Sequence, residues 1–173
     1  QQVVRDAELG KRLADILVRI HDHTGAEGWL LLHIEVQGQS QAEFAERMYV
    51  YHYRIYDRFR RPVVSLAVLA DSHATWRPDH FGYGRWGCEL SLRFPMVKLI
   101  DYQERWAELD GSSNPFAVVV QAQLQAQLQG TVSRYQAKLA LIKSLYRRGL
   151  ARADILELFR CIDWMLRLPE DLD

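Results

Sequence analysis

The sequence predicts an α/β domain. Its first half alternates strand-like and helix-like hydrophobic patterns, and its last third repeats apolar residues at helical spacing. A chain of 173 residues is long enough to form one domain around its own hydrophobic core. Hydrophobic residues make up 49% and charged residues 25%, as in a globular domain and unlike a disordered one. We therefore expect one domain over residues 1–173, with a strand-and-helix core at about 1–100 and a helical part at about 114–168.

The first half of the chain predicts two strands, a helix and a third strand. Residues 12–21 and 29–37 are strand-like, and the segment 22–28 between them holds two glycines, a threonine and an aspartate. Residues 41–59 predict a helix, because apolar side chains recur along one stripe. The stripe consists of Phe44, Met48, Tyr51 and Ile55. Residues 63–70 form a continuous apolar run, which is typical of a strand buried on both faces.

The second half predicts a loop, one more strand and three helices. Residues 72–87 are rich in aromatic and turn-forming residues and predict an irregular loop. Residues 88–96 alternate apolar and polar side chains, as in a half-buried strand. Helices are expected at 115–129, 132–148 and 154–167, the last two as an antiparallel pair. Asn114 suits the N-cap of the first of these helices, and Gly149 is placed to stop the second.

The charge balance excludes a generally basic nucleic-acid-binding coat. Lys and Arg number 22, and Asp and Glu also number 22, so the formal net charge is zero. Any contact with nucleic acid must therefore come from local groups of basic residues. Segment 131–153 has six basic residues and no acid, whereas 154–173 has six acids. These charges either neutralise each other in the helical pair or leave a basic patch.

Cysteine content and hydropathy suggest a cytoplasmic protein. The two cysteines, Cys88 and Cys161, are too few for a disulfide framework or a zinc site, which favours a reducing compartment. No apolar run approaches the roughly 18–20 residues needed to span a bilayer, so we expect no membrane partner. The first six residues lack the pattern of a signal peptide, and the chain does not begin with Met, so we expect further residues upstream.

The first two strands are predicted to bring two carboxylates together. If the connecting loop is centred on Gly25, Asp15 lies opposite Glu35 in the antiparallel pair. Alternation of side chains then puts Asp15, His33, Glu35 and Gln37 on one face. The other face is apolar and consists of Ile16, Val18, Ile20, Leu30, Leu32, Ile34 and Val36.

Two directly opposed carboxylates repel each other, so something must offset their charge. A divalent cation such as Mg²⁺ is one solution, with Asp15, Glu35 and the backbone carbonyl of Val36 as hard oxygen ligands. The ion would polarise a phosphate and activate a water, and Gln37 would lie within reach of either. The alternative is a polar hairpin face on which the carboxylates pair with Arg or Lys. His33 is expected to be a hydrogen-bonded structural residue rather than a ligand.

Several short motifs along nearly the whole chain resemble one known family. The segment 8–37 has Asp15 in its first strand and ends on His33-Ile34-Glu35-Val36-Gln37. The further motifs are Phe44-Ala45-Glu46-Arg47-Met48, Arg61-Pro62-Val63-Val64-Ser65-Leu66-Ala67, Trp76-Arg77-Pro78, Phe94-Pro95 with Lys98-Leu99, Asn114-Pro115-Phe116-Ala117 and Ile162-Asp163-Trp164. Together they resemble the PD-(D/E)XK nuclease superfamily, in the branch of recombination-promoting nucleases and putative transposases.

This resemblance implies a PD-(D/E)XK-like αβββαβ core followed by C-terminal helices. The helix that opens the family fold is expected to be missing from this sequence. The resemblance makes Asp15 and Glu35 the metal ligands and puts Gln37 in the third catalytic position, where the superfamily more often has Lys. It implies cleavage of DNA phosphodiesters with Mg²⁺, or with Mn²⁺ or Ca²⁺. Because Gln37 has no charge, more of the charge stabilisation would fall to the metal.

DNA contacts are expected from the helix that follows the proposed metal strand. Arg47, Arg54 and Arg58 recur there at i, i+7 and i+11 and form a basic edge, which is either a DNA contact or an ordinary solvated face. In the aromatic loop, Trp76, Arg77 and Tyr83 either stack on bases or pack within the protein.

The sequence therefore predicts a metal-dependent DNA endonuclease. The alternatives are a catalytically inactive DNA-binding or protein-interaction module on the same scaffold, and a purely structural fragment. Cutting both strands of a duplex requires two active sites or two sequential nicks, and a homodimer is one way to supply the two sites.

Overall fold

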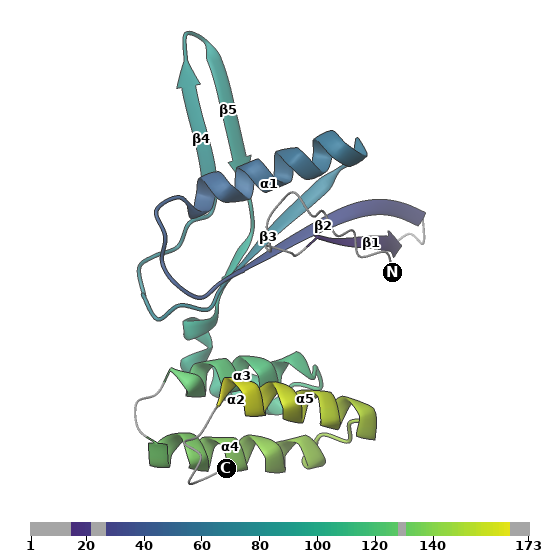
Figure 1. Ribbon diagram of the computed structural model, residues 1–173, viewed down its shortest axis with the longest axis vertical. Coiled ribbons are helices and arrows are strands. Elements are labelled where there is room, and N and C mark those ends of the chain that lie inside the picture. The colour runs from purple at the N-terminus through teal and green to yellow at the C-terminus, as the bar shows by residue number, and fades with distance from the viewer. Residues whose placement is uncertain (1–14, 22–26, 128–130, 167–173) are drawn as a thin grey trace. The chain divides into compact units, whose positions relative to one another are not determined.

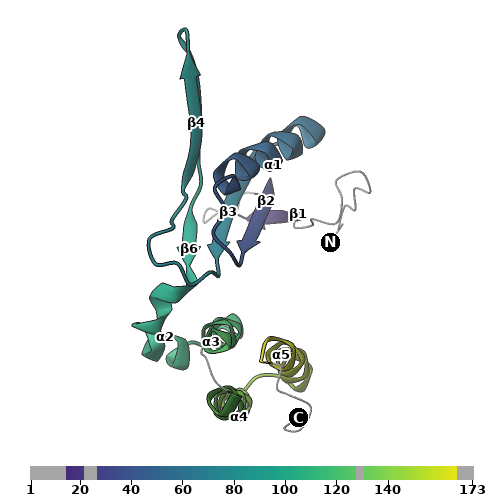
Figure 2. The same cartoon turned by 60° about the vertical axis from the view of Figure 1, so that its left-hand side comes forward.

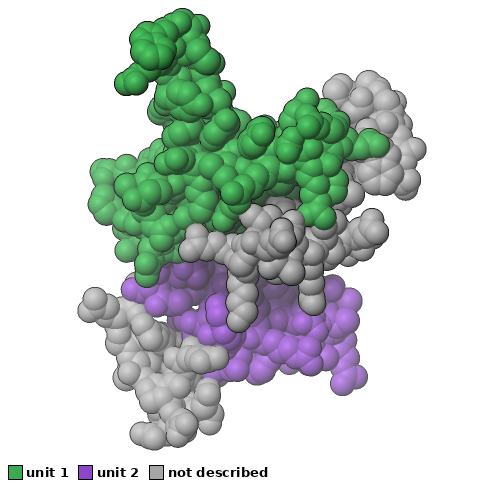
Figure 3. All heavy atoms as spheres, turned by 45° about the horizontal axis from the view of Figure 1, so that its top comes forward, with its two compact units in different colours: residues 1–98 green, residues 99–173 purple. Residues whose placement is uncertain are grey.

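The computed structural model describes the backbone of residues 15–21, 27–127 and 131–166 (Figure 1). Side chains are described from residue 31 to 127 and from 135 to 166. The chain divides into two compact units, 1–98 and 99–173, which Figure 3 colours separately. The helix that opens the family fold would precede Asp15, so the prediction about it concerns residues outside the described ones.

The first unit is built on a four-stranded mixed sheet, which confirms the predicted α/β class. Its strands are β1 (Asp15–His21), β2 (Glu27–Gln37), β3 (Val63–Leu69) and β6 (Met96–Lys98), in the spatial order β1-β2-β3-β6. β1 is antiparallel to β2, whereas β2, β3 and β6 are parallel to one another. Helix α1 (Phe44–Phe59) connects β2 to β3, as a parallel pair of strands requires.

The predicted register of the first hairpin is wrong by two residues. Asp15 pairs with His33 rather than with Glu35, and His21 pairs with Glu27. Strand β2 begins at Glu27, two residues earlier than its apolar pattern indicates. A shift of two residues leaves every side chain on its own face, and the facial pattern therefore cannot distinguish the two registers. Position 15 remains on the face of Glu35 but becomes its diagonal neighbour.

Helix α1 covers the polar face of the sheet, not the apolar one. Leu31 and His33 of β2 are buried beneath it, and the His33 ring meets the Tyr51 ring edge-on at 5.7 Å. On the opposite face the side chain of Val36 is 64% exposed. The core between α1 and the sheet is formed by Phe44, Met48, Ala67, Leu69 and Phe94. The polar face can be covered because its polar side chains form hydrogen bonds with one another and with side chains of α1.

Strand β3 is less symmetrically buried than its apolar run predicts. Ser65, Ala67 and Leu69 are buried, whereas the alternate side chains are only half-buried. One face of β3 therefore supplies core contacts to α1, in the same way as the matching face of β2.

The predicted irregular loop 72–87 contains a strand. β4 (His80–Arg85) and β5 (Cys88–Arg93) form an antiparallel hairpin that projects beyond α1 (Figures 1 and 2). Its two-residue turn has φ +54° at Trp86 and +82° at Gly87, as a type I′ turn requires. A left-handed conformation costs a non-glycine residue about 1–2 kcal/mol. The predicted strand 88–96 is divided into β5 and β6 by the pair Phe94-Pro95.

The second unit is helical, and the three predicted helices are confirmed with small changes at their ends. They are α3 (Phe116–Ala126), α4 (Thr131–Arg147) and α5 (Arg152–Met165). A 3-10 helix at Leu99–Gln103 and helix α2 (Trp106–Gly111) precede them and were not predicted. The core of this unit is formed by Val118, Ala122, Leu141, Leu145, Ile162 and Leu166. Among the described helices, none is long and apolar enough to cross a bilayer.

Gly149 acts as predicted, whereas the N-cap position of α3 is Pro115 and Asn114 binds the helix from one residue further out. The Asn114 side-chain oxygen accepts a hydrogen bond from the Phe116 amide at 3.0 Å, and Gly149 adopts φ +64° just after α4. Lys138 of α4 forms an ion pair with Asp163 of α5 at 2.8 Å. This pair supports mutual neutralisation of the basic and acidic segments. Gln121 of α3 is buried and donates a hydrogen bond to Asp110 at 2.6 Å.

Candidate functional site

The candidate site lies at the end of β2, on the face covered by α1. Glu35 and Gln37 are two residues apart and share this face, and the Glu35 side chain retains 18% of its exposure. Val36 lies between them, pairs with Val68 of β3 and points its side chain to the opposite face. The two polar side chains thus occupy neighbouring positions where a parallel strand ends.

Arg47 of α1 reaches down to both polar side chains. Its Nη2 donates to Gln37 Oε1 at 2.6 Å, and its Nη1 donates to Gln41 Oε1 at 2.6 Å. Its Nε lies 3.3 Å from Glu35 Oε1 but makes no hydrogen bond among the described residues, so this contact is an ion pair. The guanidinium also lies 5.2 Å from the centre of the Phe44 ring. Glu35 and Gln37 are therefore held together by one cation from the helix.

The three arginines predicted as a basic edge have different environments. The Arg47 side chain keeps only 15% of its exposure and faces the candidate site, whereas Arg54 and Arg58 are exposed on α1. Arg58 also lies over the Phe59 ring at 5.4 Å. The structure thus brings Arg47 to Glu35 and Gln37 and leaves Arg54 and Arg58 on the outer side of the helix.

Position 15 approaches the same face from β1. Asp15 is a diagonal neighbour of Glu35 in the observed register, and diagonal neighbours on one face are separated by about 7–8 Å. Where side chains are described, no group of three or more His, Cys, Asp or Glu residues forms a metal site. Carboxylate and carbonyl oxygens are nevertheless the hard donors that Mg²⁺ prefers, so Asp15, Glu35 and Val36 fit such an ion in donor chemistry.

Two histidines share one hydroxyl beside the site. The Nδ1 atoms of His33 and His52 lie 3.1 and 3.0 Å from Ser65 Oγ. Burial, followed by repulsion from His52, lowers the pKa of His33 from 6.5 to about 4, and burial also lowers the pKa of His52. His33 is therefore neutral at neutral pH, and its Nε2, 3.9 Å from Glu35 Oε2, adds no ion pair there. The prediction that His33 has a structural role agrees with this hydrogen bonding.

Acidification is expected to destabilise the protein through His33. The unfolded ring takes up a proton near pH 6.5 and the folded ring only near pH 4, so the unfolded state binds more protons between these values. The free energy of unfolding should therefore fall by about 3 kcal/mol as the pH is lowered across this interval. Urea unfolding of the wild type and of His33→Gln at a series of pH values measures the difference. Parallel pH profiles for the two proteins would contradict this assignment.

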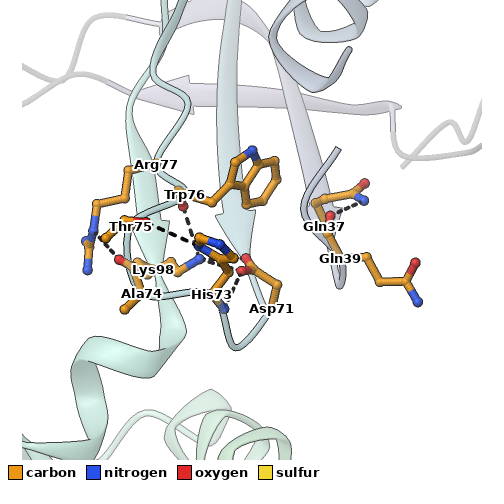
Figure 4. A network of polar contacts seen from close by, with 9 residues as sticks. All are labelled: Gln37, Gln39, Asp71, His73, Ala74, Thr75, Trp76, Arg77 and Lys98. Atoms are coloured by element: carbon orange, nitrogen blue, oxygen red, sulfur yellow. Dashed lines mark hydrogen bonds and ion pairs between the residues drawn. The ribbon is translucent and has the colours of Figure 1, made fainter. Parts of the chain in front are cut away.

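A second polar cluster lies where β3 and β6 end (Figure 4). Lys98 Nζ donates to both Asp71 carboxylate oxygens, at 2.7 and 2.6 Å, and to the Trp76 carbonyl at 3.1 Å. The Lys98 side chain has no exposed surface, and that of Asp71 is 4% exposed. Asp71 also accepts a hydrogen bond from the His73 amide at 2.8 Å. The two charges neutralise each other, so this cluster stabilises the fold rather than offering a charge to a ligand.

Sequence reasoning did not single out Asp71. An acid directly after a buried strand was the available signal, but its partner is 27 residues away and belongs to a strand of only three residues. Trp76 covers this ion pair, with its ring 5.3 Å from Lys98 Nζ and 5.4 Å from the Phe44 ring. Of the two roles considered for Trp76, its contacts support packing within the protein.

The described elements define a mixed α/β protein with a four-stranded sheet in one unit and helices in the other. The candidate site on the sheet combines carboxylate and amide side chains. Comparisons with protein-family models, curated proteins and solved structures found no match for this chain. A functional assignment therefore depends on the chemistry of the site itself.

Proposed function

We propose that this chain is a metal-dependent DNA endonuclease of the recombination-promoting nuclease and putative transposase type, within the PD-(D/E)XK superfamily. The main support is the β1–β2 register, in which Asp15 and Glu35 are diagonal neighbours on one sheet face. Gln37 follows on the same face, at the end of the strand. This arrangement gives the acid, acid, glutamine pattern that the resemblance implies.

The order of elements partly agrees with the proposed αβββαβ core. The segment β1-β2-α1-β3 has its antiparallel hairpin, crossover helix and parallel strand. One difference is that two described strands, instead of three, precede α1. The proposal therefore depends on the site-bearing half of the core.

Asp15, Glu35 and the Val36 carbonyl would hold Mg²⁺, Mn²⁺ or Ca²⁺. When bound, a catalytically competent ion of this kind polarises a phosphodiester and lowers the pKa of an attacking water. Gln37 is positioned by Arg47 and by its own donation to the Gln39 carbonyl at 2.7 Å. Arg47 supplies a positive charge beside the amide, which compensates for the absence of lysine at position 37. Because Arg47 also pairs with Glu35, it holds that carboxylate beside Gln37.

A second candidate function is supported by the same arginine. The Arg47 guanidinium is already bonded to Gln37 at 2.6 Å and paired with Glu35 at 3.3 Å, so it can replace a metal ion as the balancing charge. With this role for Arg47, the chain is a catalytically inactive module that binds DNA or a protein partner. The two candidates differ in whether the site acts on DNA once metal is supplied.

Plasmid nicking tests the nuclease proposal. The wild type should nick supercoiled DNA with Mg²⁺ or Mn²⁺ and not with EDTA, and a Ca²⁺ arm separates ion binding from catalysis. Asp15→Ala and Glu35→Ala should each lower the rate about a hundredfold or more, since each removes a ligand of the ion. Glu108→Ala is a matched control, because that exposed acid pairs with Arg105 in the other unit. Full cleavage by both site variants would refute the site, and DNA binding without cleavage in any metal would favour the inactive module.

We propose DNA as the macromolecular partner and the cytoplasm as the location. The thiols of Cys88 and Cys161 are both free, as a reducing compartment would keep them. A homodimer would supply the two active sites that cutting of both DNA strands requires.

A further inference from the structure

Aromatic rings form a continuous track from α1 onto the projecting hairpin. Tyr53 and Tyr49 stack with centroids 6.4 Å apart, and Tyr49 stacks on Phe81 of β4 at 5.3 Å. Phe81 meets Tyr83 edge-on at 6.0 Å. Two elements that are far apart in sequence therefore form one row of rings, none of which belongs to the candidate site on β2.

The two ends of this track are open to solvent. Tyr53 is 52% exposed, and Tyr83 is 57% exposed. Three residues after Tyr83, Trp86 at the hairpin tip is 97% exposed. A large ring that is almost wholly in water contributes little to the core, so burial does not account for a tryptophan at this position.

The turn itself does not require a tryptophan. Trp86 has φ +54°, a conformation that asparagine adopts far more easily, and Asn-Gly is the pair that type I′ turns prefer. Trp86 is thus an unfavourable residue for this turn, and its indole ring is almost fully exposed to solvent. This combination points to a ligand that contacts the ring face.

Positive charges accompany the rings. The Arg85 guanidinium lies 5.7 Å from the centre of the Trp86 ring, and Arg54, which follows Tyr53 in the sequence of α1, is exposed. Arg93, at the base of the hairpin, is also exposed. Exposed aromatic faces with neighbouring arginines are the combination that binds unpaired bases and their phosphates.

We propose that Tyr53, Tyr83 and Trp86 form a stacking surface for the unpaired bases of single-stranded DNA. The choice of DNA rests on the proposed function, whereas the stacking surface rests on the rings and arginines described above. A single strand is favoured over an intact duplex because paired bases hide their faces within the helical stack. The hairpin would then hold a displaced or frayed strand while the site on β2 acts on the phosphodiester backbone.

Binding of a labelled oligonucleotide in EDTA tests this proposal without cleavage. Trp86→Asn should keep or strengthen the turn and bind the single strand about fivefold to a hundredfold more weakly. Trp86→Phe should recover most of the affinity, because it restores an aromatic face. Trp164→Ala is the matched control, since that indole is 66% exposed on α5 and lies outside the track. Tyr83→Leu provides a second variant that leaves the turn unchanged.

Two further DNA ligands distinguish base stacking from attraction of the phosphates alone. An abasic oligonucleotide should bind the wild type as weakly as the ordinary strand binds Trp86→Asn, and an intact duplex should bind less tightly than the single strand. Unchanged affinity of Trp86→Asn and Tyr83→Leu would overturn the proposal. Loss of a wild-type dimer in Trp86→Asn, with DNA affinity unchanged, would also overturn it and assign the tip to protein contact. Because every arm is measured in EDTA, where no cleavage is expected, failure of the nuclease proposal leaves this result interpretable.

Discussion

Replacing Lys98 with methionine is expected to lower the free energy of unfolding of the first unit by about 3–5 kcal/mol. Methionine fills a similar volume but leaves the Asp71 carboxylate, 4% exposed, without its cation. Three hydrogen bonds are lost at the same time, two to Asp71 at 2.7 and 2.6 Å and one to the Trp76 carbonyl at 3.1 Å. The measurement is urea unfolding followed by far-ultraviolet circular dichroism.

A double variant distinguishes loss of the cation from loss of packing. Asp71→Asn removes the unpaired buried charge and keeps an acceptor for the His73 amide. The double variant Lys98→Met with Asp71→Asn should therefore recover part of the stability. If Lys98→Met alone costs less than about 1 kcal/mol, the ion pair contributes less than its burial indicates.

Replacing Phe44 with alanine is the second large effect, with an expected cost of about 3–5 kcal/mol. Phe44 is fully buried at the start of α1, and its ring contacts Trp76 at 5.4 Å and Phe94 at 6.3 Å. Removing the ring also removes the surface on which the Arg47 guanidinium rests, at 5.2 Å. Stability and the position of Arg47 should therefore change together. Thermal unfolding measures the first effect, and nicking activity, where the wild type has it, reports the second.

Two controls accompany Phe44→Ala. Phe44→Leu should cost less, because it leaves a smaller cavity. Phe116→Ala removes a phenyl ring that is 69% exposed and should change stability by no more than about 0.5 kcal/mol. Equal losses at Phe44 and Phe116 would show that the cluster around α1 does not control stability of the fold.

The faces of β2 could be predicted from sequence, but the face that α1 covers could not. Alternation correctly groups His33, Glu35 and Gln37, and a two-residue change of register leaves this grouping intact. Hydropathy then favours burial of the opposite face, whereas Val36 on that face is 64% exposed. Shared hydrogen bonds, such as those of His33 and His52 to Ser65, permit the polar face to be covered, and such pairings are not readable from periodicity.

The candidate site shows the same division between local and long-range information. The positions of Glu35 and Gln37 follow from strand geometry alone. The role of Arg47 depends on where the crossover helix lies against the sheet. The helical spacing of Arg47 predicted only that it lies on a basic edge of this helix. Strand β4 was missed because the glycines at 82 and 84, which alternate with Phe81 and Tyr83, give this segment the composition of a loop.

The late position of β6 in the chain has a consequence for folding kinetics. The sheet of the first unit is complete only when Met96–Lys98 pairs with β3, and the strand before it in sequence belongs to a separate hairpin. The Asp71 carboxylate therefore depends on a lysine 27 residues further along the chain, whereas the backbone hydrogen bonds of each helix in the second unit join residues only four apart. Chains rich in such local contacts fold faster than those that must close long loops. The helical unit should thus reach its native structure first, and closure of the Asp71–Lys98 pair should be among the last events in the folding of the unit that contains the candidate site.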